Sequence, residues 1–167
     1  NQAFGLSDIG ESKVDALARL VTRDTGTAIS THNERVDGSQ QMGDVVFLLT
    51  DTMASRREIF EKSLKYKLMT KLVIETRMGS DNGRVYAINP NKRNHIRAWE
   101  ETLYSDDEAE VSACGASVSV GPTAELIAGL AVWQMIRWFS VEQGGEDSLE
   151  NETILSMRPL LTVSRTF

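Results

Sequence analysis

The chain has 167 residues, of which 41% are hydrophobic and 25% are charged, a balance typical of one globular domain. The formal net charge of -6 argues against a surface for nucleic acid or an anionic membrane, so we expect neither partner. A single cysteine, Cys114, excludes a disulfide within the chain and favours a reducing, cytoplasmic setting. No apolar stretch is long enough to span a membrane, and the first ten residues do not resemble a signal peptide.

The first part of the chain predicts a helix and a strand. Asp8–Asp24 carries apolar side chains at the i, i+3, i+4 and i+7 positions of an amphipathic helix. Asp8 with Glu11 three residues later is the expected N-terminal cap of this helix. Thr27–Val36 is rich in Thr, Ile and Val and therefore predicts a short strand.

A buried strand and a helix follow. Asp44–Thr50 contains an unbroken apolar run, which is the pattern of a strand buried in a parallel sheet. Met53–Tyr66 predicts a helix, and Ser55 with Glu58 three residues later fits a capping box. Between the two stands Asp51, which either caps the helix or forms one wall of a ligand site.

The second half alternates strands and helices. Strands are predicted over Lys71–Thr76 and Gly83–Pro90, with a turn between them at a glycine-rich stretch. Asn91–Leu103 predicts a short helix, and Tyr104–Gly121 is acidic, rich in small residues and expected to be a long loop. The helix that starts at Pro122 and runs to about residue 139 is apolar nearly all round, so we expect it in the core or in a subunit interface.

The alternation predicts an α/β fold with a mostly parallel, Rossmann-like sheet flanked by helices. The C-terminal residues form a polar linker over Glu142–Asn151 and then two short strands broken at Pro159. We therefore divide the chain into a domain over residues 1–140 and a linker with C-terminal strands over residues 141–167.

Three segments together resemble the ThiF/MoeB/HesA family, whose members adenylate the C-terminus of ubiquitin and of ubiquitin-like sulfur carriers. "DIGESKVDAL" from Asp8 resembles the family's D-[IV]-G-x-x-K helix. "VVFLLTDTMASRR" from Val45 resembles its strand that ends in an aspartate. "CGASVSVGPTAELIAGLAVWQMI" from Cys114 is similar to its crossover loop and the apolar helix behind that loop. Gln2 resembles the glutamine of its N-L-x-R-Q segment.

The resemblance implies an ATP- and Mg²⁺-dependent adenylyltransferase acting on a ubiquitin-like or sulfur-carrier protein, and a homodimer. Lys13 would be the cation near the phosphates, and Gln2 would lie close to the site. Asp51 would lie at the Mg²⁺ and phosphate end, because ligands of open α/β sheets bind outside the carboxyl ends of the strands. Cys114 could form a thioester, although a lone cysteine is more often buried and inert.

The sequence also departs from the family. The family's glycine-rich phosphate loop lies upstream of the segment that Gln2 matches, and no G-x-G-x-x-G occurs in this chain, so we expect an N-terminally truncated fold. The paired cysteines that bind zinc in many members are absent, so no zinc site is expected. The alternative is a degenerate, non-catalytic module for dimerisation or scaffolding. A basic cluster over Asn89–Arg97 is either a solvated surface or a contact for an acidic partner or a phosphate.

Overall fold

The computed structural model describes residues 4–106, 121–146 and 148–167, which form two compact units, Asn1–Val36 and Asp37–Phe167. In the first unit a 3-10 turn over Leu6–Asp8 precedes helix α1 (Lys13–Thr25). The Oγ atom of Ser12 accepts a hydrogen bond from the backbone N–H of Asp15 at 3.2 Å, so Ser12 is the N-terminal cap of α1.

Two predictions for the first unit are wrong. Asp8 does not cap α1; its side chain instead accepts a hydrogen bond from the backbone N–H of Gly5 and pairs with Arg19. Thr27–Val36 contains no strand. The composition of this stretch favours a strand, but a strand also needs a neighbouring strand for its backbone hydrogen bonds, and no strand of the described residues pairs with it.

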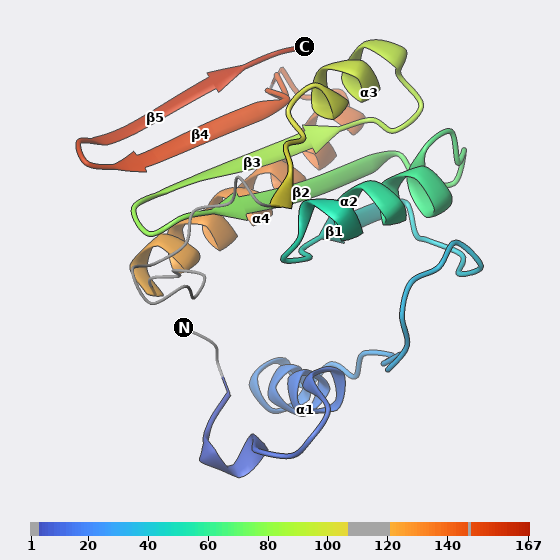
Figure 1. Cartoon of the computed structure of the whole chain (residues 1–167), viewed down its shortest axis with the longest axis vertical. Coiled ribbons are helices and arrows are strands. Elements are labelled where there is room, and N and C mark those ends of the chain that lie inside the picture. Colours follow the sequence, from blue (N-terminus) through green and yellow to red (C-terminus); the bar gives the residue numbers. More distant parts are fainter. Residues whose placement is uncertain (1–3, 107–120, 147) are drawn as a thin grey trace. The chain divides into compact units, whose positions relative to one another are not determined.

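The second unit is built on one five-stranded sheet with the order β1-β2-β3-β4-β5 (Figure 1). Its strands are β1 (Val45–Leu48), β2 (Leu72–Met78), β3 (Asn82–Ile88), β4 (Glu152–Met157) and β5 (Leu160–Arg165). Only β1 and β2 pair in parallel, while each of the other three neighbouring pairs is antiparallel. The α/β class is confirmed, but the sheet is mixed rather than mostly parallel.

Connection lengths explain the mixed sheet. The chain passes from β1 to β2 through a helix, and such a crossover allows parallel strands. Only Gly79–Asp81 separates β2 from β3, and only Arg158 and Pro159 separate β4 from β5. Links this short join antiparallel neighbours. The predicted turns and the break at Pro159 were therefore correct, and they already implied antiparallel pairs.

Helices cover both faces of the sheet (Figure 1). On one face lie α2 (Met53–Ile59), which continues as a π-helical turn over Phe60–Leu64, and α3 (Arg93–Glu100). On the other face lies α4 (Gly121–Glu142). Each face has its own apolar core. The core under α2 and α3 contains Leu48, Phe60, Leu64, Val73, Tyr86, Ile88, Ile96 and Trp99. The core under α4 contains Leu72, Ile74, Val85, Ala87, Ile127, Ala131, Trp138 and Leu155.

Helix α4 is buried along one side only. Thr123, Ile127, Ala131, Gln134 and Trp138 are buried, which is the spacing of one helical face against the sheet. Large apolar side chains remain exposed on the rest of the helix: Leu126, Val132, Trp133, Ile136 and Phe139. Among the described residues, no helix is both long and apolar enough to cross a membrane.

Gly83 of β3 lets α4 approach the sheet closely. A Cβ atom at this position would lie 2.5 Å from Cδ1 of the buried Ile127 and 2.9 Å from the backbone oxygen of Arg77. We expect Gly83→Ala to lower the free energy of unfolding by about 1–3 kcal/mol, because a backbone atom and a packed core side chain would both have to move. Denaturation in urea measures this change.

Gly129 provides the matched control. It lies in the same helix as Ile127, and a Cβ atom there would meet nothing within 4 Å. Gly129→Ala is therefore expected to raise the free energy of unfolding by about 0.5–1 kcal/mol through helix propensity. Equal effects of the two substitutions would contradict the close approach at Gly83.

His95 in α3 predicts a pH dependence of stability. Its Nδ1 accepts a hydrogen bond from the backbone N–H of Asn89 at 3.1 Å and lies 3.3 Å from Nδ2 of Asn151. Burial, with a smaller contribution from the charge of Lys92, lowers the pKa of His95 below its ordinary value of 6.5. The fold therefore favours the neutral imidazole, and protonation favours the unfolded chain.

The stabilisation linked to His95 should be complete above pH about 6.5 and should be lost as the pH falls below that value. We expect the free energy of unfolding to decrease between pH about 7.5 and about 5.5, and His95→Gln to remove part of that decrease. Identical profiles for wild type and His95→Gln would contradict this assignment.

Candidate functional site

A cavity of about 520 Å³ opens in the second unit where β1 and β2 end and β3 begins. It is lined by Asp51, Met53, Arg56, Arg77, Met78, Gly79, Asn82, Gly83, Arg84, Glu101, Thr102, Tyr104, Asp106 and Arg165. The volume is within the range of roughly 300–1,000 Å³ that small-molecule sites occupy. Its place outside the carboxyl ends of the parallel pair is where open α/β sheets bind ligands.

Asp51 is exposed and lies in the wall of this cavity, between β1 and α2. It does not cap α2. The Oγ1 atom of Thr52 accepts the hydrogen bond from the backbone N–H of Ser55 at 3.2 Å, so Thr52 is the cap. The capping interpretation of Asp51 and the capping box from Ser55 to Glu58 are therefore wrong. With the capping role filled by Thr52, the Asp51 carboxylate remains available to a ligand in the cavity.

A buried charge cluster forms the cavity wall next to β2. We call it the Glu75 cluster; it consists of Glu75, Arg56, Arg77 and Trp99. Glu75 is fully buried, and its carboxylate lies 2.7 Å from Nε of Arg56 and 2.9 Å from Nε of Arg77. Nε1 of Trp99 donates a hydrogen bond to the same carboxylate at 3.2 Å. Two guanidinium groups share one carboxylate, so the cluster carries one excess positive charge.

Neighbouring groups fix both guanidinium groups in place. Arg77 donates hydrogen bonds to the backbone oxygen of Thr102 at 2.8 Å and to its hydroxyl at 3.0 Å. The Arg77 guanidinium also lies 4.5 Å from the ring centre of Tyr86, and burial raises the pKa of that phenol. Arg56 donates to the backbone oxygen of Thr76 at 3.0 Å. Both arginines are nearly buried yet line the cavity, so they offer it pre-oriented donors.

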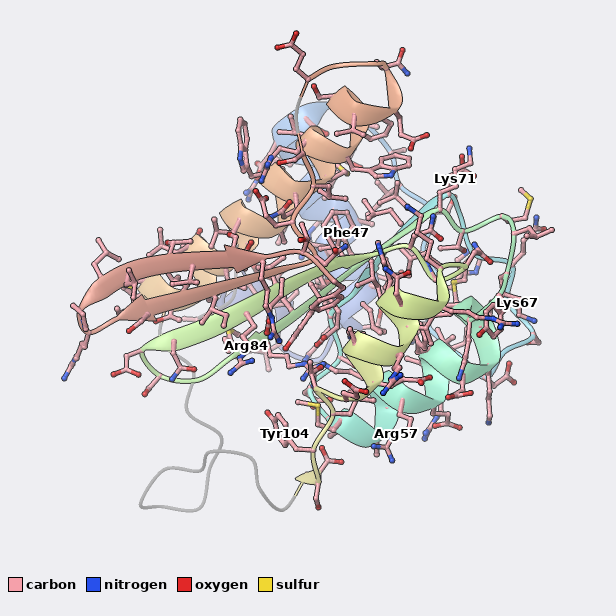
Figure 2. All side chains as sticks on the ribbon, turned by 90° about the horizontal axis from the view of Figure 1, so that it is seen from above. Phe47, Arg57, Lys67, Lys71, Arg84 and Tyr104 are labelled. Carbon is pink, nitrogen blue, oxygen red and sulfur yellow. The ribbon has the colours of Figure 1, made fainter. Side chains whose placement is uncertain are left out.

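Two further arginines line the cavity, and one of them, Arg84, is the cross-strand neighbour of Arg77. Arg84 of β3 and Arg165 of β5 both pair with the buried carboxylate of Glu152 on β4, which lies between them. Arg84 is labelled in Figure 2 beside the strands. With the Glu75 cluster, four guanidinium groups thus face one cavity, a donor set suited to phosphate and carboxylate oxygens.

The side chain of Asp106, which follows α3 in the chain, binds the first turn of α2. Its carboxylate accepts hydrogen bonds from the backbone N–H groups of Met53 at 2.5 Å and Ala54 at 3.1 Å. A negative charge at this position is favoured by the helix dipole. The contact ties the chain that follows α3 to the rim of the cavity.

The sequence did not identify Arg56, Glu75, Arg77 or Asp106 as members of this site. A signal was present for two of them, since Glu75 and Arg77 are two residues apart in the strand and therefore share one face. Arg56 and Asp106 carry no such signal, because their roles depend on the packing of α2 against β2 and on the return of the chain after α3.

The remaining predicted site residues are Lys13, Gln2 and Cys114. Lys13 is exposed at the start of α1 in the first unit and lines a hollow of about 190 Å³ together with Asp8 and Glu11. Gln2 and Cys114 lie outside the described residues. Because the two units are described separately, the convergence of Lys13 and Asp51 on one ligand remains a prediction.

The cavity residues fit an ATP–Mg²⁺ complex chemically. The described residues contain no group of three or more His, Cys, Asp or Glu side chains that could form a metal site made of protein ligands alone. Mg²⁺ does not need such a group, because it keeps several waters and uses one or two carboxylates together with substrate phosphates. Asp51 can supply the carboxylate, and the arginines can balance the phosphate charge.

The chain is similar to a solved structure in fold and to a family model in sequence. The crystal structure of selenomethionine PaaA superposes with a TM-score of 0.55 at 16% sequence identity, over 98% of this chain and 57% of that chain. This likeness shows the fold, and the chain spans little more than half the length of PaaA. No curated protein sequence matches. The model of the ThiF family matches residues 2–162, nearly the whole sequence, and the chain therefore belongs to the ThiF family.

Proposed function

We propose that this protein is part of an ATP-dependent adenylyltransferase that activates the C-terminus of a ubiquitin-like or sulfur-carrier protein. Membership of the ThiF family supports the reaction class. The observation that carries the proposal is Asp51 in the wall of a cavity at the carboxyl end of the parallel strands, which four arginines also line. A carboxylate for Mg²⁺ and cations for phosphates are the two requirements of a nucleotide triphosphate site.

In the proposed reaction, a carboxylate oxygen of the carrier's C-terminus attacks the α-phosphorus of ATP. The bond from that phosphorus to the bridging oxygen breaks, and pyrophosphate leaves with the electron pair. When bound, Mg²⁺ neutralises charge on the phosphates and orients them. Asp51 would hold the ion through its carboxylate oxygens, and Lys13 would neutralise charge that develops during the transfer.

The buried arginines would hold anionic groups of the substrates. Arg56 and Arg77 are already oriented by Glu75, Thr76 and Thr102, so little side-chain entropy is lost when they bind. Gln2 would lie near the nucleotide, and Cys114 would be the candidate for a thioester with the activated carrier. A reducing, cytoplasmic setting and a homodimer complete the proposal.

An exchange assay tests the proposal. Incubation of the protein with ATP, Mg²⁺, labelled pyrophosphate and a candidate carrier should return label to ATP, because adenylate formation is reversible. Exchange must require both the carrier and its free C-terminal carboxylate, so a carrier with an amidated C-terminus is the control. Failure of every ubiquitin-like and sulfur-carrier protein of the source organism to support exchange would overturn the proposal.

The second candidate function is a non-catalytic module for dimerisation or scaffolding. Helix α4 favours it, because Trp133 is 55% exposed in the middle of an apolar side that the sheet does not cover. Self-association commonly covers such a surface. Sedimentation should then detect a dimer that Trp133→Glu dissociates. A monomer that catalyses pyrophosphate exchange would exclude this candidate.

A further inference from the structure

A positive surface lies at the end of the sheet opposite the cavity. Its two segments, Lys65–Lys71 and Asn89–Arg97, contain six Lys and Arg residues and no Asp or Glu. The whole chain carries a net charge of -6, so these segments are an exception to its overall acidity. Asn89–Arg97 is the basic cluster that the sequence singled out, and the fold brings Lys65–Lys71 beside it.

Hydrogen bonds hold the two segments side by side. The backbone N–H of Tyr66 donates to the backbone oxygen of Pro90 at 3.0 Å. The side-chain amide of Asn91 donates to the backbone oxygens of Lys67 at 3.3 Å and Thr70 at 2.9 Å. Thr70 is fully buried and donates its hydroxyl to the backbone oxygen of Gly43 at 3.1 Å. The loop after α2 is therefore anchored at both ends.

This anchored loop turns apolar side chains outward. Leu68 is 86% exposed, Met69 is 57% exposed and Tyr66 is 54% exposed. Tyr66 has a φ of 57°, a left-handed conformation that is unusual for an aromatic residue. Such backbone strain persists only where surrounding contacts impose it, and it is concentrated at functional positions. The fold thus keeps three large apolar groups in solvent on a loop that is preorganised for contact.

The same two segments carry exposed cations without an acidic partner among the described residues. Lys67, Lys92 and Arg93 are exposed, and none of them forms an ion pair with another described residue. Lys71 differs, because it pairs with Asp44 at 3.0 Å. We define the loop surface as Tyr66, Lys67, Leu68, Met69, Lys92 and Arg93. It combines exposed apolar side chains with unpaired cations, two kinds of group that protein interfaces use.

The loop surface is separate from the candidate site. It lies where β1 and β2 begin and β3 ends, whereas the cavity lies where β1 and β2 end and β3 begins. The length of β2, seven residues, separates the two by roughly 20 Å. Figure 2 shows Lys67 and Lys71 at the end of the sheet away from Arg84 and Tyr104.

The geometry points to the loop surface as a docking site for an acidic segment of another protein that carries exposed apolar side chains. Acidic groups of that segment would pair with the three free cations, and its apolar groups would cover Leu68 and Met69. Aliphatic side chains at the centre do not suit nucleic acid, whose outer surface is phosphate.

Direct binding of defined probes tests this inference. The probe is a fluorescent peptide that alternates glutamate and leucine, and fluorescence anisotropy measures its binding to the full chain. The same peptide with glutamine in place of glutamate is the charge control. Vesicles of phosphatidylserine and a short DNA duplex represent the other two classes of partner. We expect the acidic peptide to bind, with affinity that falls as salt is added.

Two matched pairs of variants locate the binding. Lys67→Glu with Lys92→Glu should weaken binding of the acidic peptide by about tenfold or more. Arg57→Glu with Arg158→Glu changes the net charge equally at exposed sites elsewhere and should have an effect of less than about twofold. Leu68→Ser should weaken binding, whereas Leu160→Ser, at another well exposed leucine, should not. All of these positions are exposed, so circular dichroism should report an unchanged fold.

Three results would overturn the inference. The first is an equal loss of peptide binding in the two charge-reversed pairs, which would indicate non-specific attraction. The second is binding to vesicles or DNA but not to the acidic peptide, which would assign the surface to another class of partner. The third is absence of peptide binding at low salt. None of these results depends on adenylation, because peptide binding is measured without ATP, and the pyrophosphate exchange assay tests the cavity separately.

Discussion

Glu75→Gln is expected to lower the free energy of unfolding by about 3–5 kcal/mol, the largest effect on stability that we predict for a single substitution. Glutamine keeps the size of the side chain but removes the one negative charge that Arg56 and Arg77 share. Both guanidinium groups would then remain nearly buried without a counter-charge. Guanidinium chloride denaturation at neutral pH, compared with wild type, measures the loss.

A compensating variant separates charge balance from packing. When Arg56→Met, Glu75→Leu and Arg77→Met are combined, the buried charges disappear together, and the protein should be more stable than Glu75→Gln alone. Glu101→Gln is the surface control. Its carboxylate pairs with Arg97 at 2.8 Å but is well exposed, so its removal should cost less than about 0.5 kcal/mol. A similarly small cost for Glu75→Gln would show that the cluster does not require its central carboxylate.

Asp51→Asn is expected to reduce pyrophosphate exchange by about 100-fold, because an amide is a much poorer ligand for Mg²⁺ than a carboxylate. Stability should change by less than about 0.5 kcal/mol, because Asp51 is exposed and Thr52 rather than Asp51 caps α2. Exchange rates at saturating ATP, together with a denaturation curve for the same variant, measure both quantities.

The control for Asp51 is Asp44→Asn, which removes an exposed carboxylate at the other end of β1. It should leave exchange unchanged, so the two variants distinguish a local effect from a change in overall charge. An excess of Mg²⁺ should partly restore the Asp51→Asn enzyme if the lost interaction is with the ion. Full activity of Asp51→Asn without added Mg²⁺ would remove this residue from the proposed site.

Local patterns were sufficient for most elements of the second unit. The apolar run before Asp51, the helix after it and the strands on either side of Gly79 were all predicted close to their observed positions. Each depends on periodicity and turn residues within a short window, and both are properties of the sequence itself. The strand predicted over Thr27–Val36 failed because its formation depended on a partner strand, which a local pattern cannot report.

The composition of helix α4 did not predict which of its faces packs against the sheet. Its apolar residues predicted a place in the core or in a subunit interface, and within the described residues the sheet covers only the side that carries Ile127 and Trp138. The remaining apolar side chains are as hydrophobic as the buried ones, so the sequence alone could not tell which face meets the sheet. In the packed fold Gly83 allows the side that carries Ile127 to approach β3 closely.

The sequence by itself determined the family, the succession of strands and helices in the second unit, and the aspartate at the end of β1. Only the tertiary structure decided that the sheet is mixed, that Glu75 holds two arginines against the cavity, and that the loop after α2 lies beside the start of α3. The physical reason is distance along the chain. Hydrophobic periodicity and turn chemistry act within a few residues, whereas a buried ion pair or a shared surface joins residues whose separation only the packed fold closes.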